Sequence, residues 1–335
     1  MSYEDENFVS NINYLISQVF TFSYVVVSSI GIIGNFLNLM LCLNQRIAKD
    51  SMGYFNILMS ICNILFLIAG QINYAPLIVN QDLALTSEYS CKLLHYFARV
   101  LAQISAWLNV LAILERIEFF LKQNLFKFAT NNNVKTAIYL GLIFFLLVFN
   151  APNLFFNLSS VSTYVLVNNQ TINYTSCTSI KSIILITSSE ISTIRIFLPI
   201  VLQTCLSVVL IRFLYKNNDK YNNNASPRFT NEYRYAFTIV ILNIVCLFTE
   251  IPYMINTIYF GALGVTPTYP LNPNTSRSMA IAMFIYACTF SLSSYMYCSL
   301  FFVNIFLNKK IKKEIRYIFC GTIATQYVQN KNHRT

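Results

Sequence analysis

Long apolar runs alternate with polar gaps along this chain. Each run is long enough for a helix to cross about 30 Å of hydrocarbon. The runs predict seven helices, at about 19–43, 54–79, 91–119, 134–156, 191–215, 234–260 and 278–307. Within these segments the apolar residues occupy nearly every face, which is typical of helices surrounded by lipid or other helices. We therefore predict an all-α polytopic membrane protein with a seven-transmembrane helix bundle.

The composition supports a membrane protein. The chain has 335 residues, of which 56% are hydrophobic and 11% are charged. Soluble domains carry about 25% charged residues. The mean hydropathy of +0.53 agrees with this contrast. An ordinary cytosolic enzyme, a disordered chain and a disulfide-stapled miniprotein are excluded, and the lack of an internal repeat disfavours a transporter with inverted halves.

The distribution of Lys and Arg predicts the orientation. Segments 44–53, 116–135, 212–234 and 308–335 carry 18 of the 23 basic residues. Basic residues concentrate in cytoplasmic segments, so the N-terminus is predicted outside and the C-terminus inside, at the plasma membrane. The predicted domains are an extracellular N-terminus (1–18), the bundle (19–307), a short amphipathic eighth helix (308–320) and a cytoplasmic tail (321–335).

The predicted eighth helix is basic on one side and apolar on the other. Its basic residues would attract anionic membrane lipids. They are Lys309, Lys310, Lys312, Lys313 and Arg316. Cys320 at its end is a candidate for palmitoylation. Because the cluster is short and tied to the membrane, we do not expect it to bind nucleic acid.

Glycosylation sequons fall in or beside the predicted outer loops. Asn157, Asn169 and Asn173 each precede Ser or Thr at the required spacing. An Asn-rich chain also generates such sequons by chance, and that alternative stays open.

Two of the nine cysteines lie in predicted outer positions. Cys91 begins the third helix, and Cys177 lies in the long loop before the fifth. The outer space is oxidising, so we predict a Cys91–Cys177 disulfide, with two free thiols as the alternative. No Cys pair has the spacing of a metal site, and we predict no metal and no cofactor.

Several motifs in order resemble the rhodopsin-like (class A) G-protein-coupled receptors, in a divergent form similar to invertebrate orphan and peptide receptors. The resemblance covers residues 19–320. It is carried by Gly34-Asn35, by Asn63 where the family usually has Asp, by Glu115-Arg116-Ile117 placed 25 residues after Cys91, by Pro199 and by Pro252.

The chain also departs from the family pattern. Asn63 replaces an Asp that helps to bind sodium in the family, and Ser105, which aligns with a second family position, is alone a poor ion site. Glu250 stands where the family has a tryptophan. The Asn-Pro-x-x-Tyr motif of helix seven is missing, and its counterpart is either Leu300–Asn304 or Ser294–Tyr297.

The resemblance implies a receptor that couples to a heterotrimeric G protein by outward motion of helix six. Glu115 and Arg116 would form the resting pair of the switch, and Arg116 would meet the G protein on activation. Any membrane helix can end in such interfacial charges, which is the structural alternative.

Charged and polar residues inside the span are the candidates for a ligand pocket. A carboxylate at a helix centre is costly, so Glu250 should face the bundle and have a partner. Glu250 could form an ion pair with Arg195. Alternatively, an acidic group of the ligand could bind Arg99 or Arg195. In the third alternative, a protonated Glu250 donates a hydrogen bond to a backbone carbonyl. His95 and Gln103 are further candidates for pocket lining.

The predicted function is a receptor for a neuropeptide or another extracellular ligand, and no enzyme activity is expected. In the family that the chain resembles, amine receptors carry an Asp at the position of Ala98, and no other acid lies nearby in helix three, so a biogenic amine ligand is not expected. A chemosensory receptor for a small ligand is the first alternative. A membrane transporter or channel is the second, since Glu250, Arg99 and Arg195 could mark a polar pathway.

Overall fold

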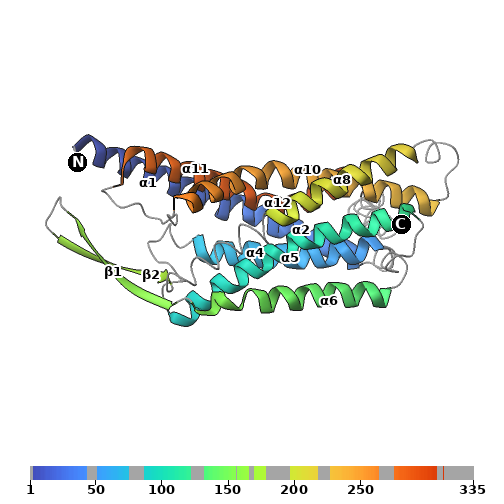
Figure 1. Ribbon diagram of the computed structural model, residues 1–335, viewed down its shortest axis with the longest axis horizontal. Helices are drawn as coiled ribbons and strands as arrows, with labels where there is room; N and C mark the ends of the chain where they lie inside the picture. Colours follow the sequence, from blue (N-terminus) through green and yellow to red (C-terminus); the bar gives the residue numbers. More distant parts are fainter. Residues whose placement is uncertain are drawn as a thin grey trace, which may run out of the picture.

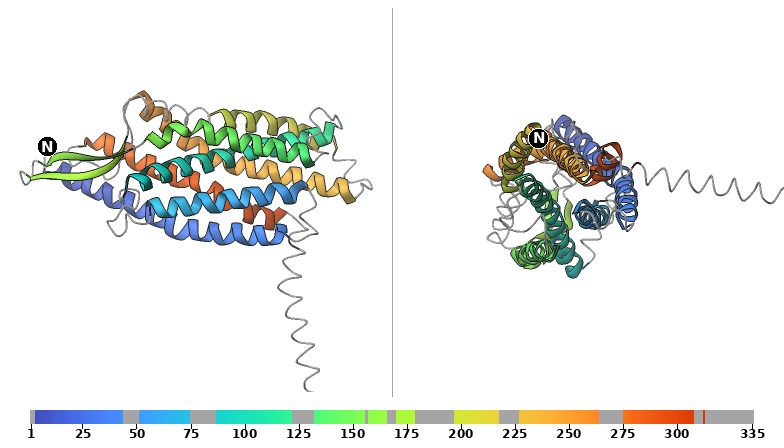
Figure 2. Two further views of the ribbon diagram at one scale, coloured as in Figure 1. Left: turned by 90° about the horizontal axis from the view of Figure 1, so that it is seen from below. Right: turned by 90° about the vertical axis from the view of Figure 1, so that its right-hand side faces the viewer.

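Long helices run side by side along one axis, and a β-hairpin projects at one end (Figure 1). This computed structural model describes residues 3–43, 51–74, 87–121, 132–155, 157–165, 170–178, 197–217, 227–263, 275–307 and 312. Seen end-on, the helices form a bundle rather than a layer (Figure 2). The predicted eighth helix and tail lie outside the described residues, apart from Lys312.

Within the described residues, seven helical spans are long and apolar enough to cross a membrane. They are Glu4–Leu43, Gly53–Ile72, Glu88–Leu121, Asn133–Phe155, Leu198–Lys216, Phe229–Phe260 and Arg277–Leu307. Each corresponds to one predicted apolar run, so the prediction of seven apolar helices is confirmed. The chain therefore has the helices of a multi-pass membrane protein.

These spans are built from the following elements. The first contains α1 (Tyr3–Thr21), the π-helical η1 (Phe22–Val27) and α2 (Ser28–Leu43). Next come α4 (Ser51–Tyr74), α5 (Glu88–Leu121), α6 (Asn132–Phe149) and the 3-10 helix η4 (Ala151–Phe155). The last are α8 (Leu198–Lys216), α10 (Pro227–Ala262), α11 (Arg277–Ser294) and α12 (Met296–Leu307).

The N-terminal segment is helical, although residues 1–18 were predicted only as a terminus outside the bundle. Three acidic residues in its first turn favour a helix start, because negative charge stabilises the helix N-terminus. Its buried residues recur every three or four positions and pack on α11 and α10. They are Val9, Ile12, Ile16 and Phe20. Arg277 of α11 also donates to Asp5, with 2.6 Å between Nε and Oδ1.

Helix seven is interrupted, where the sequence predicted one continuous helix. Tyr295 forms a turn between α11 and α12 without any proline. The hydroxyls of Ser293 and Ser294 both donate to the carbonyl of Phe290, and such back-bonding bends helices. The interruption faces η1, since the Tyr24 hydroxyl lies 3.1 Å from Ser294 Oγ.

The hairpin is an element that the sequence reading did not predict. Strands β1 (Asn157–Val165) and β2 (Gln170–Thr178) pair antiparallel, with Asn157 opposite Thr178 and Val165 opposite Gln170. β1 also contacts α5. The hairpin lies at the same end of the bundle as the N-terminus (Figure 1).

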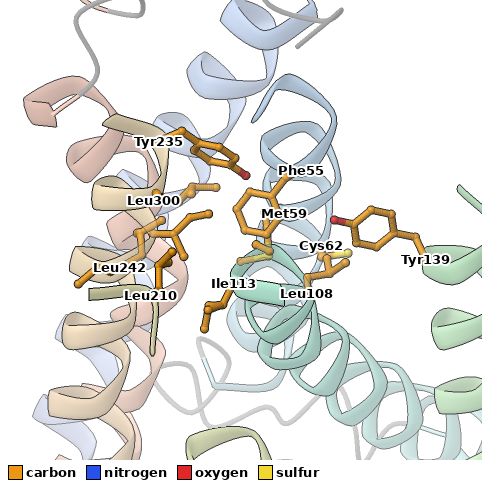
Figure 3. Packing of buried hydrophobic residues seen from close by; sticks show 14 of the residues in the cluster. Phe55, Met59, Cys62, Leu108, Ile113, Tyr139, Leu210, Tyr235, Leu242 and Leu300 are labelled. Carbon is orange, nitrogen blue, oxygen red and sulfur yellow. The ribbon is translucent and has the colours of Figure 1, made fainter. Parts of the chain in front are cut away.

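The main apolar core joins six helices. Figure 3 shows part of it, with side chains from α4, α5, α6, α8, α10 and α12. The residues include Phe55, Met59, Leu108, Ile113, Tyr139, Leu210, Tyr235, Leu242 and Leu300. By contrast, large apolar side chains such as Phe144 (69% exposed) and Phe248 (75% exposed) lie on the outside of the bundle. This surface suits contact with lipid better than contact with water.

Candidate functional site

A buried ion cluster lies at the end of α5. The side chain of Arg116 is 1% exposed, although it is the largest of the fully buried side chains. Its Nη2 lies 3.1 Å from Glu115 Oε1, and its Nη1 donates to Glu232 Oε2 on α10. Arg presents several donors in a planar fork, so one guanidinium can hold two carboxylates.

A fourth charge comes from α6. Lys135 Nζ donates to Glu115 Oε1, and the two side chains are 4% and 0% exposed. The cluster thus contains two acids and two bases from three helices, and its formal charges cancel. Burial of such charges is costly unless they are paired, and each charge of this cluster has an oppositely charged partner.

Aromatic rings surround the guanidinium of Arg116. Its Cζ lies 4.7 Å from the ring centre of Tyr235 and 5.7 Å from that of Phe119. Tyr235 and Tyr139 also belong to the apolar core (Figure 3). These rings exclude water, and exclusion of water strengthens the ion pairs.

The contact between Arg116 and Glu232 joins α5 to α10. Glu232 is the most exposed member of the cluster, at 17%. If α10 moved away from α5, Glu232 could become hydrated, whereas Glu115 would remain in ion pairs with Arg116 and Lys135.

The sequence found half of this cluster. Glu115 and Arg116 were predicted as a local pair, and the structure places them together. Glu232 and Lys135 were not identified, although both are charged residues close to the ends of apolar segments. Charge at the predicted inner ends of helices four and six is the signal that could have found them.

The predicted motif residues Asn35, Asn63 and Ser105 form one neutral network. Asn35 Nδ2 donates to the carbonyl of Tyr297 at 2.8 Å. Asn63 Nδ2 donates to Asn35 Oδ1 at 3.3 Å, and Ser105 Oγ donates to Asn63 Oδ1 at 3.1 Å. The network links α2, α4, α5 and α12 through buried amides.

A second amide network extends this one along the same helices. Asn304 Nδ2 donates to Asn38 Oδ1 at 3.2 Å and to Asn56 Oδ1 at 3.3 Å. Asn38 Nδ2 donates to Ser60 Oγ at 2.8 Å. Of the two segments considered for helix seven, Leu300–Asn304 therefore supplies an amide to the packing, and Ser294–Tyr297 contains the interruption.

Arg99 and Gln103 lie against α6 and η4. Arg99 Nη1 donates to Asn153 Oδ1. Gln103 exchanges two hydrogen bonds with Asn150, at 2.7 Å and 3.2 Å. These contacts connect α5 to the end of α6. They hold both side chains at a helix interface. Neither side chain lines the small cavity between α5, α8, α10 and α12.

Glu250 and Pro199 lie beside a small cavity between α5, α8, α10 and α12. Glu250 is 7% exposed, as the prediction that it faces the bundle interior requires. Pro199 is in the first turn of α8, where backbone N–H groups have no helical acceptor, so the lack of an N–H on proline removes no helical hydrogen bond. Pro252 lies inside α10, and the amide of Asn256 donates to its carbonyl at 3.1 Å.

Cys91 is buried and disulfide-bonded. Its predicted partner, Cys177, lies on β2 opposite Leu158, and the pairing of these two cysteines stays a prediction. Asn157 and Asn173 lie on β1 and β2, and their side chains fall outside the described part of the molecule.

The remaining predicted site residues are not described. Arg195, Asn169 and Cys320 lie outside the described residues, as does the side chain of His95. Among the residues that the structure describes, no group of three or more His, Cys, Asp or Glu could hold a metal ion.

A search of known protein families finds no family that matches this chain, and no curated protein matches it either.

Proposed function

We propose that this chain is a G-protein-coupled receptor whose resting state is held by the Arg116–Glu232 ion pair. One observation carries the proposal: a buried arginine of α5 bonds a carboxylate of α10 at the predicted cytoplasmic end of a seven-span bundle. Opening of this contact would expose a cationic pocket between the two helices. A cationic pocket is suited to the carboxyl groups and carbonyls at a helix end of a G-protein subunit.

Activation in this proposal is a shift between two populations. An agonist stabilises the state that it binds better, and the resting contacts set how rare that state is. A charge-assisted hydrogen bond contributes about 1.5–3 kcal/mol, so its loss shifts such an equilibrium about 10-fold to 100-fold. A shift of this size in the equilibrium between the two states is enough for the Arg116–Glu232 bond to determine the basal activity.

The proposal includes the orientation that the charges predict. The N-terminus, the hairpin and the predicted Cys91–Cys177 bridge would be extracellular, with Asn169 and Asn173 open to glycosylation. The ion cluster, the basic segment 308–320 and Cys320 would face the cytoplasm and its anionic lipids. An extracellular peptide, or a small chemosensory ligand, would enter from the side of the hairpin.

Basal signalling tests this proposal without a ligand. In cells with G-protein activation reporters, Glu232→Gln should raise the basal signal about tenfold per receptor at the surface, because a neutral amide holds Arg116 less strongly. Arg116→Ala should abolish the signal in the Glu232→Gln background. Glu88→Gln is the matched control, since Glu88 pairs with Lys92 on an exposed face of α5.

Equal basal signals from wild type, Glu232→Gln and Glu88→Gln at equal surface levels, with every G-protein reporter, would contradict the receptor proposal. An ion current that survives Arg116→Ala would favour the transporter or channel alternative.

A further inference from the structure

Three helices of the bundle are interrupted at nearly the same level. The π-helical η1 (Phe22–Val27) separates α1 from α2, and the turn at Tyr295 separates α11 from α12. Inside α10, Pro252 has no N–H and removes one bond of the helix. The ring of Tyr253 lies 5.4 Å from that of Phe290, so Pro252 is within about two turns of Tyr295 along the bundle. Interruptions of these kinds are the places where long helices bend.

The interruptions of the first and last helices contact each other. The Tyr24 hydroxyl lies 3.1 Å from Ser294 Oγ. Ser23 Oγ lies 3.3 Å from the Tyr295 hydroxyl. Tyr24 is 1% exposed, and its ring packs on Gly70 of α4, where a Cβ would lie only 2.9 Å from Tyr24 Cε1. These contacts make η1 and the turn at Tyr295 one joint, with Tyr24 at its centre.

On the N-terminal side of this joint, α1 and α11 pack side by side (Figure 1). At the far end, Arg277 donates to Asp5, and its Cζ lies 5.5 Å from the ring centre of Phe8. Close to the joint, the ring of Phe20 meets that of Phe290 edge-on, with 6.4 Å between the centres. The two helices are therefore held together at both ends of their contact.

The C-terminal end of α10 packs with these two helices. Phe260 is 2% exposed and belongs to the same apolar cluster as α1 and α11. Asn256 Nδ2 donates to Thr289 Oγ1 of α11 at 3.0 Å and to the carbonyl of Pro252 at 3.1 Å. We call α1, α11 and residues 253–262 of α10 the N-terminal unit.

On the other side of the joint, α2 packs on α12 and α4. Glycine allows the close approach of α12, because a Cβ at Gly34 would lie 3.0 Å from Phe301 Cδ1. Asn35 Nδ2 also donates to the carbonyl of Tyr297 at 2.8 Å. The first and last helices thus form two packed pairs, α1 with α11 and α2 with α12, which meet at the joint.

We propose that the N-terminal unit tilts as one body on this joint and thereby couples the N-terminal helix to the core of the bundle. The three interruptions are its covalent links to α2, α12 and the rest of α10. A tilt of about 10° would move the far end of the 19-residue α1 by about 5 Å. The tilt would break the contact of Tyr24 with Ser294, next to the bond between Asn35 and Tyr297. This device does not depend on the receptor proposal.

Distances between pairs of spin labels test the tilt in the purified chain. The labels occupy three exposed positions, Asn11→Cys on α1, Ser278→Cys on α11 and Tyr89→Cys on α5, two at a time. Cys205, Cys288 and Cys320 are replaced by Ser. Both distances to the label on α5 should show a second population shifted by about 5 Å. The distance between the labels on α1 and α11 should keep a single population.

Deletion of Val26 should remove the second population. A π-helical turn holds one residue more than an α-helical turn, so the deletion makes the first helix continuous and keeps both sides in register. Val26→Ala is the matched control, since Val26 is 44% exposed and the substitution keeps the extra residue. Tyr24→Phe loses the hydroxyl contact with Ser294 and should enlarge the second population about twofold to tenfold.

A single population for every pair of labels, in wild type and in Tyr24→Phe, would overturn the proposal. A second population that persists after deletion of Val26 would also overturn it. The same holds if the distance between the labels on α1 and α11 varies as much as the other two. If the deletion prevents folding, Tyr24→Phe decides the question.

Discussion

Replacement of Lys135 by Met is expected to destabilise the folded chain by about 3–5 kcal/mol, because it leaves a buried carboxylate undercompensated. Lys135 and Glu115 are 4% and 0% exposed, and Glu115 also contacts Arg116. Without the ammonium group, one guanidinium must balance both Glu115 and Glu232. The cost arises from the net charge of the buried cluster, which changes from neutral to negative.

The double variant Lys135→Met with Glu115→Gln separates charge from packing. It restores a neutral cluster, so it should recover most of the lost stability. Lys92→Met is the matched control, since Lys92 and Glu88 form an exposed pair on α5. An exposed pair contributes about 0–1 kcal/mol, and the control should unfold close to wild type.

Thermal unfolding of the purified chain in detergent measures these effects. The buried free thiols Cys42, Cys62, Cys246 and Cys298 become reactive when the bundle opens, which reports unfolding with a thiol-reactive dye. A loss on the order of 10 °C is expected for Lys135→Met. Equal losses for the single and the double variant would show that Lys135 contributes packing and not charge balance.

The N-terminal helix is expected to contribute to stability almost as much. Ile16→Ala should cost about 2–5 kcal/mol, because Ile16 is 2% exposed and its removal leaves a cavity between α1 and its neighbours. Leu15→Ala is the matched control: Leu15 is the preceding residue and is 43% exposed. Its truncation should change the unfolding free energy by less than about 0.5 kcal/mol.

The same thiol assay, with surface expression in cells, compares the two variants. If Ile16→Ala and Leu15→Ala unfolded at the same temperature as wild type, the segment 3–20 would not be docked on α11. The packing of Val9, Ile12 and Phe20 described above would then not exist in the membrane.

The sequence predicted the seven helices because each apolar run is long enough to span a membrane and ends at a polar gap. It missed the helical N-terminus for a physical reason: Val9, Ile12, Ile16 and Phe20 are separated by Asn, Ser and Gln, so the mean hydropathy of the segment is low. Their spacing of three or four residues was the available signal. Polar composition likewise hid the hairpin, whose strands lack a long apolar run.

Single residues of the site were harder to predict than helices. The Arg116–Glu115 pair follows from adjacency in sequence, whereas Glu232 lies 116 positions from Arg116 and Lys135 lies 20 from Glu115. Such contacts depend on how helices pack, which periodicity does not determine in a uniformly apolar bundle. The interruption at Tyr295 was missed because it comes from serine hydroxyls and not from proline.

The distance between the predicted inner ends of α2 and α10 tests the central claim most directly. Spin labels at Leu43→Cys and Asn231→Cys lie on exposed positions, with exposed Cys205 and half-buried Cys288 replaced by Ser. If Arg116–Glu232 holds the resting state, Glu232→Gln should add a population at longer distance, and purified G protein should enlarge it. Identical distance distributions for wild type and Glu232→Gln, with and without G protein, would contradict the account.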